Sequence, residues 1–165
     1  MRYADAAHAW EDSARPVAAR SRVLMLRDLG EGALDAIESF ALGSGAYRFS
    51  LDLHHMGGAL ARRATTPSAV GHFPSTVFAL HTVLHLDPAQ DVSAGIRAQD
   101  ALLDALAPWA EQKTSPGFLT GMDVTEECVR AAYGPSREAL LALKAAYDPG
   151  DMFRFALPLA PASQP

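Results

Sequence analysis

The chain has 165 residues, of which 49% are hydrophobic and 20% charged, and its formal net charge is -5. Folding at this length removes roughly 70% of the unfolded surface from water, so the composition predicts a globular domain with a real core. The acidic balance argues against a nucleic-acid partner, and the single cysteine, Cys128, excludes an internal disulfide framework and a multi-cysteine zinc site.

Strand-like and helix-like periods alternate in the first half of the chain. A short β-like run at 20–26 is followed by a helix at about 31–41, which the glycines of 43–45 end. Strict alternation of apolar and polar residues predicts a strand at 47–55 and a second long strand at 76–86. We expect the apolar face of each strand to lie on helices.

Helical patterns dominate the second half. Apolar residues at helical spacing predict a helix at about 92–110, and residues 116–121 are expected to form a short strand. Asp123 is a suitable N-cap for the next helix, because Glu126 follows three residues later as in a capping box. Gly134 is predicted to end that helix.

A last helix closes the predicted domain. Pro135 suits the first turn of this helix, which is expected to run through Tyr147. The Asp-Pro-Gly sequence of 148–150 is predicted to terminate it. The prolines of 156–165 predict an irregular tail. We therefore expect one α+β domain over 1–155, with a small, mostly antiparallel sheet and helices packed on one face.

The polar side of the two long strands carries the candidate chemistry. If these strands are neighbours, Asp52, His54 and His81 project from one surface of the sheet. A carboxylate beside an imidazole is a proton-transfer pair, because the carboxylate orients the ring. We predict these three residues as catalytic. The residues predicted to bind substrate on the same surface are Arg48, Ser50 and His85.

The same pattern has a simpler explanation, which stays open. A half-exposed sheet needs a polar side facing water, and these side chains satisfy that need without any catalytic role. On a strand, His81 and His85 lie about 13 Å apart, which is too far to share a metal ion. No metal site is predicted.

Several stretches resemble the berberine-bridge-enzyme-like FAD-linked oxidases. The strings VRAAYG at 129–134 and LLALKAAYDPGDMFRF at 140–155 resemble the closing segment of that family. The string HMGGALAR at 55–62 is similar to the family's stretch that ends its first long strand. The resemblance covers nearly the whole chain. It implies a substrate domain with an antiparallel sheet, lacking the N-terminal FAD-binding domain.

Two departures from the family pattern bear on the cofactor. The family usually has a Tyr-x-Asn stretch against flavin and substrate where residues 118–120 read Phe-Leu-Thr, and its Asn-rich ending is replaced by residues 156–159. The resemblance therefore places Phe118 and Thr120 at the substrate. The two departures predict that the chain binds no flavin, and no other cofactor is expected.

Together these features predict a free-standing, flavin-free enzyme of bacterial natural-product biosynthesis. The leading hypothesis is a cofactor-independent cyclase, isomerase or dehydratase that acts on a hydrophobic small molecule by acid-base catalysis. One alternative is the substrate-binding subunit of a split FAD-dependent oxidoreductase, with FAD supplied by a partner chain. Another is a non-catalytic binding or homodimerisation module. A cytoplasmic protein without a membrane partner is expected, because the sequence has no signal-like start and no apolar run of about 20 residues.

Overall fold

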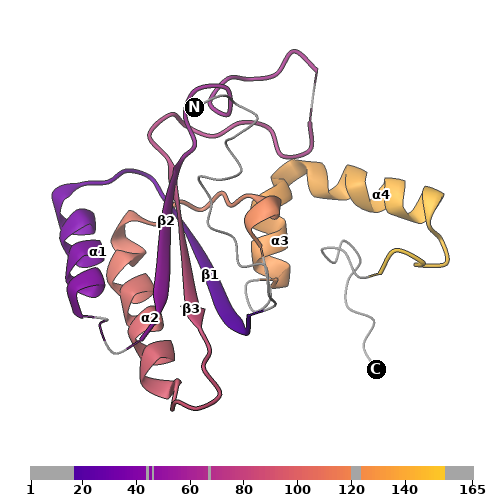
Figure 1. The fold of residues 1–165 in the computed structure, drawn as a ribbon. Helices are drawn as coiled ribbons and strands as arrows, with labels where there is room; N and C mark the ends of the chain where they lie inside the picture. Colours follow the sequence, from indigo (N-terminus) through magenta and orange to yellow (C-terminus); the bar gives the residue numbers. More distant parts are fainter. Residues whose placement is uncertain (1–16, 44, 46, 67, 120–123, 155–165) are drawn as a thin grey trace, which may run out of the picture.

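The computed structural model describes residues 17–43, 45, 47–66, 68–119 and 124–154. The sheet has three antiparallel strands in the order β1-β3-β2. The strands are β1 (Ala19–Leu26), β2 (Phe49–His55) and β3 (Phe78–His85). Helices α1 (Glu31–Gly43) and α2 (Ser93–Leu106) lie together on one face of this sheet (Figure 1). The predicted α+β class is thereby confirmed.

The main core lies between the sheet and these two helices. Apolar side chains from β1 and β3 meet those of α1 and α2, and five of them are buried. Gly95 lets α2 approach the sheet closely, because a Cβ atom there would lie 3.1 Å from side-chain atoms of Leu84 and Tyr47. The buried members of this cluster are Leu26, Ala33, Leu80, Leu102 and Leu106.

A buried polar network joins α2 to the central strand. The Gln99 side chain is fully buried, and its Nε2 donates to Thr82 Oγ1 at 2.9 Å. The side-chain oxygen Oε1 of Gln99 accepts from the Arg20 guanidinium at 2.7 Å, and the same guanidinium donates to the Asp100 carboxylate at 2.7 Å. Because buried polar groups are costly without partners, this network favours one position of α2 on the sheet.

Replacing Gln99 with Leu is expected to destabilise the fold by about 2–3 kcal/mol. The Thr82 hydroxyl loses the amide that donates to it, and one N–H group of the Arg20 guanidinium loses its acceptor. Urea unfolding followed by circular dichroism measures the change. The exposed Gln90 supplies the control, since Gln90→Leu is expected to change stability by less than about 0.5 kcal/mol. Equal effects of the two substitutions would contradict this account.

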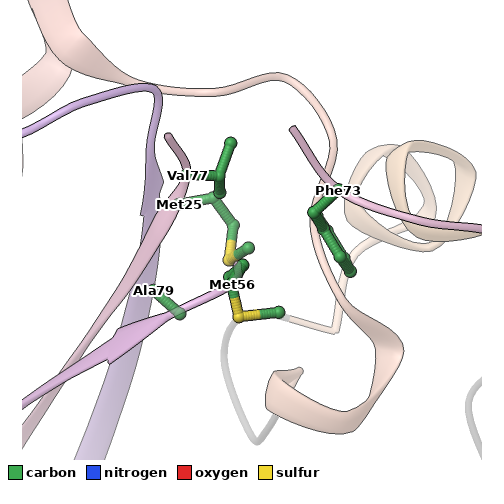
Figure 2. Packing of buried hydrophobic residues seen from close by; sticks show 5 residues of the cluster. All are labelled: Met25, Met56, Phe73, Val77 and Ala79. Carbon is green, nitrogen blue, oxygen red and sulfur yellow. The ribbon is translucent and has the colours of Figure 1, made fainter. Parts of the chain in front are cut away.

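A second cluster lies at one end of the opposite sheet face. Its five buried residues come from β1, β3 and the long connection between β2 and β3 (Figure 2). Val70 from that connection and Phe118 pack against the cluster. The β2–β3 connection therefore folds against this end of the face. The buried members are Met25, Met56, Phe73, Val77 and Ala79.

The C-terminal helices are α3 (Glu126–Tyr133) and α4 (Arg137–Tyr147), joined by the 3-10 turn η5 (Gly134–Ser136). Val129 and Ala132 of α3 are buried against Leu119. In contrast, α4 has no buried residue and extends away from the sheet (Figure 1). Among the described helices, none combines the length and apolar character that crossing a membrane requires.

Two predicted helix boundaries differ from the structure because of proline. The helix expected at 92–110 ends at Leu106 and is followed by the 3-10 turn η2 (Ala107–Trp109), since Pro108 lacks the backbone N–H that would continue α2. Pro135 lies in η5, so α4 begins only at Arg137. The predicted end of α3 at Gly134 is confirmed, and Gly134 adopts a positive φ of 49°.

The strand expected at 116–121 and the predicted cap of the following helix are also corrected. The 3-10 turn η3 (Pro116–Phe118) replaces the strand, with the Phe118 N–H donating to the Ser115 carbonyl at 3.0 Å. The N-cap of α3 is Thr125, whose hydroxyl accepts from the Cys128 N–H at 3.1 Å. Glu126 is therefore the first helical residue and not the third. Residues 120–123, which include Asp123, lie outside the described part of the chain.

The Asp148 side chain links the end of α4 to the residues that follow it. Its carboxylate accepts from the N–H groups of Met152 and Phe153 at 2.7 and 3.0 Å and pairs with Lys144. Lys144 also lies 2.8 Å from an Asp151 oxygen. The Lys144 hydrogen bond, helped by the two backbone N–H donors, lowers the pKa of Asp148 from 3.8 to about 2.

This lowered pKa predicts how the end of α4 responds to acid. The stabilisation by ionised Asp148 is complete above pH 3.8 and is lost as the pH falls through about 2. We expect the backbone amide signals of Met152 and Phe153 to keep their chemical shifts until the pH nears that lower value, as measured by NMR titration. In the Asp148→Asn variant, the change of these amide chemical shifts near pH 2 should disappear. A transition centred on the ordinary Asp pKa in the parent protein would contradict the prediction.

Candidate functional site

Polar side chains from all three strands lie on the sheet face opposite α1 and α2. The register of β2 on β3 places Asp52 directly opposite His81, and the register of β1 on β3 places Ser21 opposite Val83. Because side chains alternate along a strand, Ser21 shares a face with Asp52 and His81. We call this surface the polar face. Its polar members are Ser21, Ser50, Asp52, His54, His81 and His85.

The imidazole of His81 lies between a hydroxyl and a carboxylate. Its Nε2 is 2.7 Å from Ser21 Oγ, and its Nδ1 is 3.7 Å from an Asp52 carboxylate oxygen. The side chains of His81 and Asp52 are 28% and 39% exposed, so both remain accessible from solvent. The two residues expected to form a proton-transfer pair are thus brought together, and their catalytic role stays a prediction. A carboxylate, an imidazole and a hydroxyl in a row are suited to proton transfer, because the carboxylate can orient the ring.

A second hydroxyl–imidazole pair lies further along the polar face. Ser50 Oγ is 3.2 Å from His85 Nε2, while His85 Nδ1 is buried with no hydrogen-bond partner among the described residues. Arg48 and His85 both line a pocket of about 530 Å³, to which Tyr47 and Asp87 also contribute. The three residues predicted to bind substrate from this region therefore lie together. Neither Asp52 nor His81 lines this pocket.

The remaining predicted site residues lie toward the other end of the strands. His54 is opposite Ala79 in the register, and its ring centroid is 5.4 Å from that of Phe118 at an interplanar angle of 44°. Phe118 belongs to η3, so a residue distant in sequence is brought to the polar face beside a predicted catalytic histidine. Thr120 lies outside the described residues.

Ser21 is the member of the site that the sequence analysis missed. The short run at 20–26 was expected to be β-like, and its alternation places Ser21 on the same side as Val23 and Met25. Nothing in that local pattern states which strand lies beside it. The contact with His81 joins residues 60 positions apart and arises only because β1 pairs with β3.

Proton transfer is the chemistry that these side chains are equipped to perform, since carboxylate, imidazole and hydroxyl groups are its usual donors and acceptors. In the described part of the chain, no group of three or more His, Cys, Asp or Glu residues is arranged to hold a metal ion. The sequence matches no known family model and no curated protein.

Proposed function

We propose that the polar face is an acid-base catalytic site for a hydrophobic small molecule and that the reaction is a cofactor-independent cyclisation, isomerisation or dehydration. The observation that carries the proposal is the position of His81 between Asp52 and Ser21. Asp52 lies beside Nδ1 of the imidazole and orients the ring. His81 Nε2 exchanges a proton with the substrate, directly or through the Ser21 hydroxyl.

The pocket at the end of the strands provides the binding part of this proposal. Its volume of about 530 Å³ lies within the usual range for small-molecule sites, which is roughly 300–1,000 Å³. Arg48 and His85 bind polar groups of the substrate there, and Ser50 binds them beside His85. Phe118 contributes at the other end of the polar face. A substrate that extends from this pocket along β3 reaches His81, about 13 Å from His85 along an extended strand. The role in substrate binding predicted for Thr120 is part of the same proposal.

We also propose that the chain is a flavin-free relative of the substrate domain of berberine-bridge-like FAD-linked oxidases. The motifs at 129–134 and 140–155 support this descent, and an antiparallel sheet with helices on one face agrees with what the resemblance implies. In this proposal the protein acts in the bacterial cytoplasm and needs no bound cofactor.

Hydrogen–deuterium exchange tests the function even while the product is unidentified. The purified protein is incubated in D₂O with a panel of hydrophobic ketones and enones, whose C–H bonds next to the carbonyl are acidic. We expect mass spectrometry to detect deuterium in at least one compound, because an acid-base enzyme removes and returns such protons. The exchange should be lost in His81→Ala and reduced in Asp52→Asn. Unchanged exchange in both variants, or none with any compound of the panel, counts against the proposal.

The contacts of His81 also predict one tautomer in the neutral ring. We expect the proton on Nδ1, which faces Asp52, and an acceptor at Nε2, which faces the Ser21 hydroxyl. Two-bond proton–nitrogen correlation spectra distinguish the two tautomers. Asp52→Asn and Ser21→Ala should each produce a mixture, because each removes one contact that selects the tautomer. A mixture already present in the parent protein would contradict this prediction.

Exposed apolar residues near the C-terminus favour a second candidate, the subunit of a split FAD-dependent oxidoreductase. Leu143, Tyr147 and Phe153 are 53%, 86% and 73% exposed, and surfaces rich in large apolar side chains commonly mark protein interfaces. Co-expression with neighbouring genes tests this candidate. A yellow complex that retains flavin would support it, whereas a colourless single chain that catalyses exchange supports the acid-base enzyme. A colourless, inactive dimer that covers the polar face would favour the binding or dimerisation module.

A further inference from the structure

A large cavity lies at a different place from the polar face. It has a volume of about 960 Å³ and lies between residues of 63–66 and 68–72, in the connection from β2 to β3, and the last turn of α3 with η5. No polar member of the polar face lines it. Its size is near the upper end of the usual range for small-molecule sites, roughly 300–1,000 Å³. The cavity is therefore large enough for a drug-sized organic ligand.

The charges that line this cavity are mostly positive. Arg63, Lys113 and Arg130 face only one lining carboxylate, Glu127, although the whole chain carries a net charge of -5. Arg130 is 3.2 Å from a Glu126 oxygen and is partly neutralised by it. Arg63 has no ion-pair partner within the residues that the structure describes, so its guanidinium is the cation most available to a ligand.

One wall of the cavity is fixed by contacts made without a ligand. Lys113 Nζ donates to the His72 carbonyl at 2.6 Å and lies 4.6 Å from the centroid of the Phe73 ring, which is buried in the cluster of Figure 2. Ser68 Oγ accepts from the Gly71 N–H at 3.0 Å, and Gly71 has a φ of 74° that favours glycine. This wall is preorganised, which lowers the entropy cost of binding.

The opposite wall supplies apolar surface. Ala131 and Tyr133 of α3 and Pro135 of η5 line the cavity there. The helix is anchored by the buried Val129 and Ala132. The carbonyl end of α3 also lies on this side, and a helix C-terminus carries partial negative charge. An anionic group is therefore better placed away from the end of α3, against the wall that carries Arg63 and Lys113.

We propose that this cavity binds an organic anion, with its apolar body against the end of α3 and its carboxylate, sulfonate or phosphate group at Arg63 and Lys113. The site is separate from the proposed catalytic residues. It does not depend on the proposed function, and either proposal can fail without the other.

Two fluorescent dyes that differ in one charged group test the proposal. Anilinonaphthalene sulfonate carries the anionic group, and phenylnaphthylamine has the same aromatic body without it. Fluorescence titration of the full chain is expected to give saturable binding of both dyes, with the sulfonate bound roughly tenfold more tightly because of its charge-assisted hydrogen bonds. Absence of saturable binding, or tighter binding of the neutral dye, would overturn the proposal.

Two variants test whether the dyes bind in the cavity, and a third serves as a control. Arg63→Gln should weaken sulfonate binding roughly tenfold and leave the neutral dye unchanged. Ala131→Trp should abolish binding of both dyes by filling the cavity. Arg97→Gln removes the same charge at an exposed position on α2 and should affect neither dye. Circular dichroism confirms that each variant is folded. Parent-like sulfonate binding by folded Arg63→Gln and Ala131→Trp would also overturn the proposal.

Discussion

Replacing His81 with Ala is expected to lower the turnover number of the proposed reaction by roughly 10²–10⁴-fold, which is the usual contribution of a positioned general acid or base. The substitution removes the imidazole that contacts both Asp52 and Ser21. The loss should fall on kcat with little change in KM, because His81 exchanges the proton and does not line the binding pocket. Steady-state kinetics on a compound identified by deuterium exchange measures both constants.

Two further variants separate catalysis from folding. His55→Ala is the matched control, because His55 lies on the helix-side face of the same sheet, where its Nε2 is 2.6 Å from the Ser75 carbonyl oxygen. It should leave kcat unchanged. The double variant Asp52→Asn with His81→Ala should lose no more activity than His81→Ala alone, since the two residues act as a unit. Independent, multiplicative losses would show that Asp52 does not act through His81.

Replacing Leu80 with Ala is expected to destabilise the protein by about 2–5 kcal/mol, which is the usual cost of deleting a buried leucine side chain and leaving a cavity. Leu80 is fully buried on the central strand, opposite Leu24 of β1 and Leu53 of β2. It packs with residues of both helices that cover the sheet. Because most small domains are stable by only about 5–15 kcal/mol, this loss is a large part of the total.

Urea unfolding compares this variant with a matched control. Leu143→Ala deletes the same atoms on α4, where the side chain is 53% exposed, and should change stability by less than about 0.5 kcal/mol. If Leu80→Ala does not fold, Leu80→Val should still show a smaller loss of the same origin, about 1 kcal/mol. Equal effects at positions 80 and 143 would mean that the sheet–helix interface is not the main core.

Local patterns predicted most of the secondary structure. The alternation at 47–55 and 76–86 predicted β2 and β3, although pairing with neighbours limits the strands to Phe49–His55 and Phe78–His85. The errors fall where short-range turn chemistry competes with periodicity. Pro116 begins a turn where a strand was expected, and Pro108 and Pro135 interrupt patterns that look continuously helical.

The candidate site was predicted in part. Alternation placed Asp52 and His81 on the polar side of their strands, and their meeting depended on the assumption that the strands are neighbours. The observed register satisfies that assumption. Ser21 and the cavity near Arg63 escaped prediction, because each depends on segments that are far apart in the sequence. The roles assigned to all these residues stay proposals.

The sequence by itself determined the three strands, the four α-helices to within a few residues at their ends, and which side of each long strand is polar. These are local properties, because backbone sterics make side chains alternate along a strand and recur every 3.6 residues along a helix. Only the tertiary structure decided that β3 lies between β1 and β2, and so that Ser21, His81 and Asp52 lie in contact. The physical reason is that strand order and register depend on which apolar faces are buried together, and that burial involves the whole chain at once.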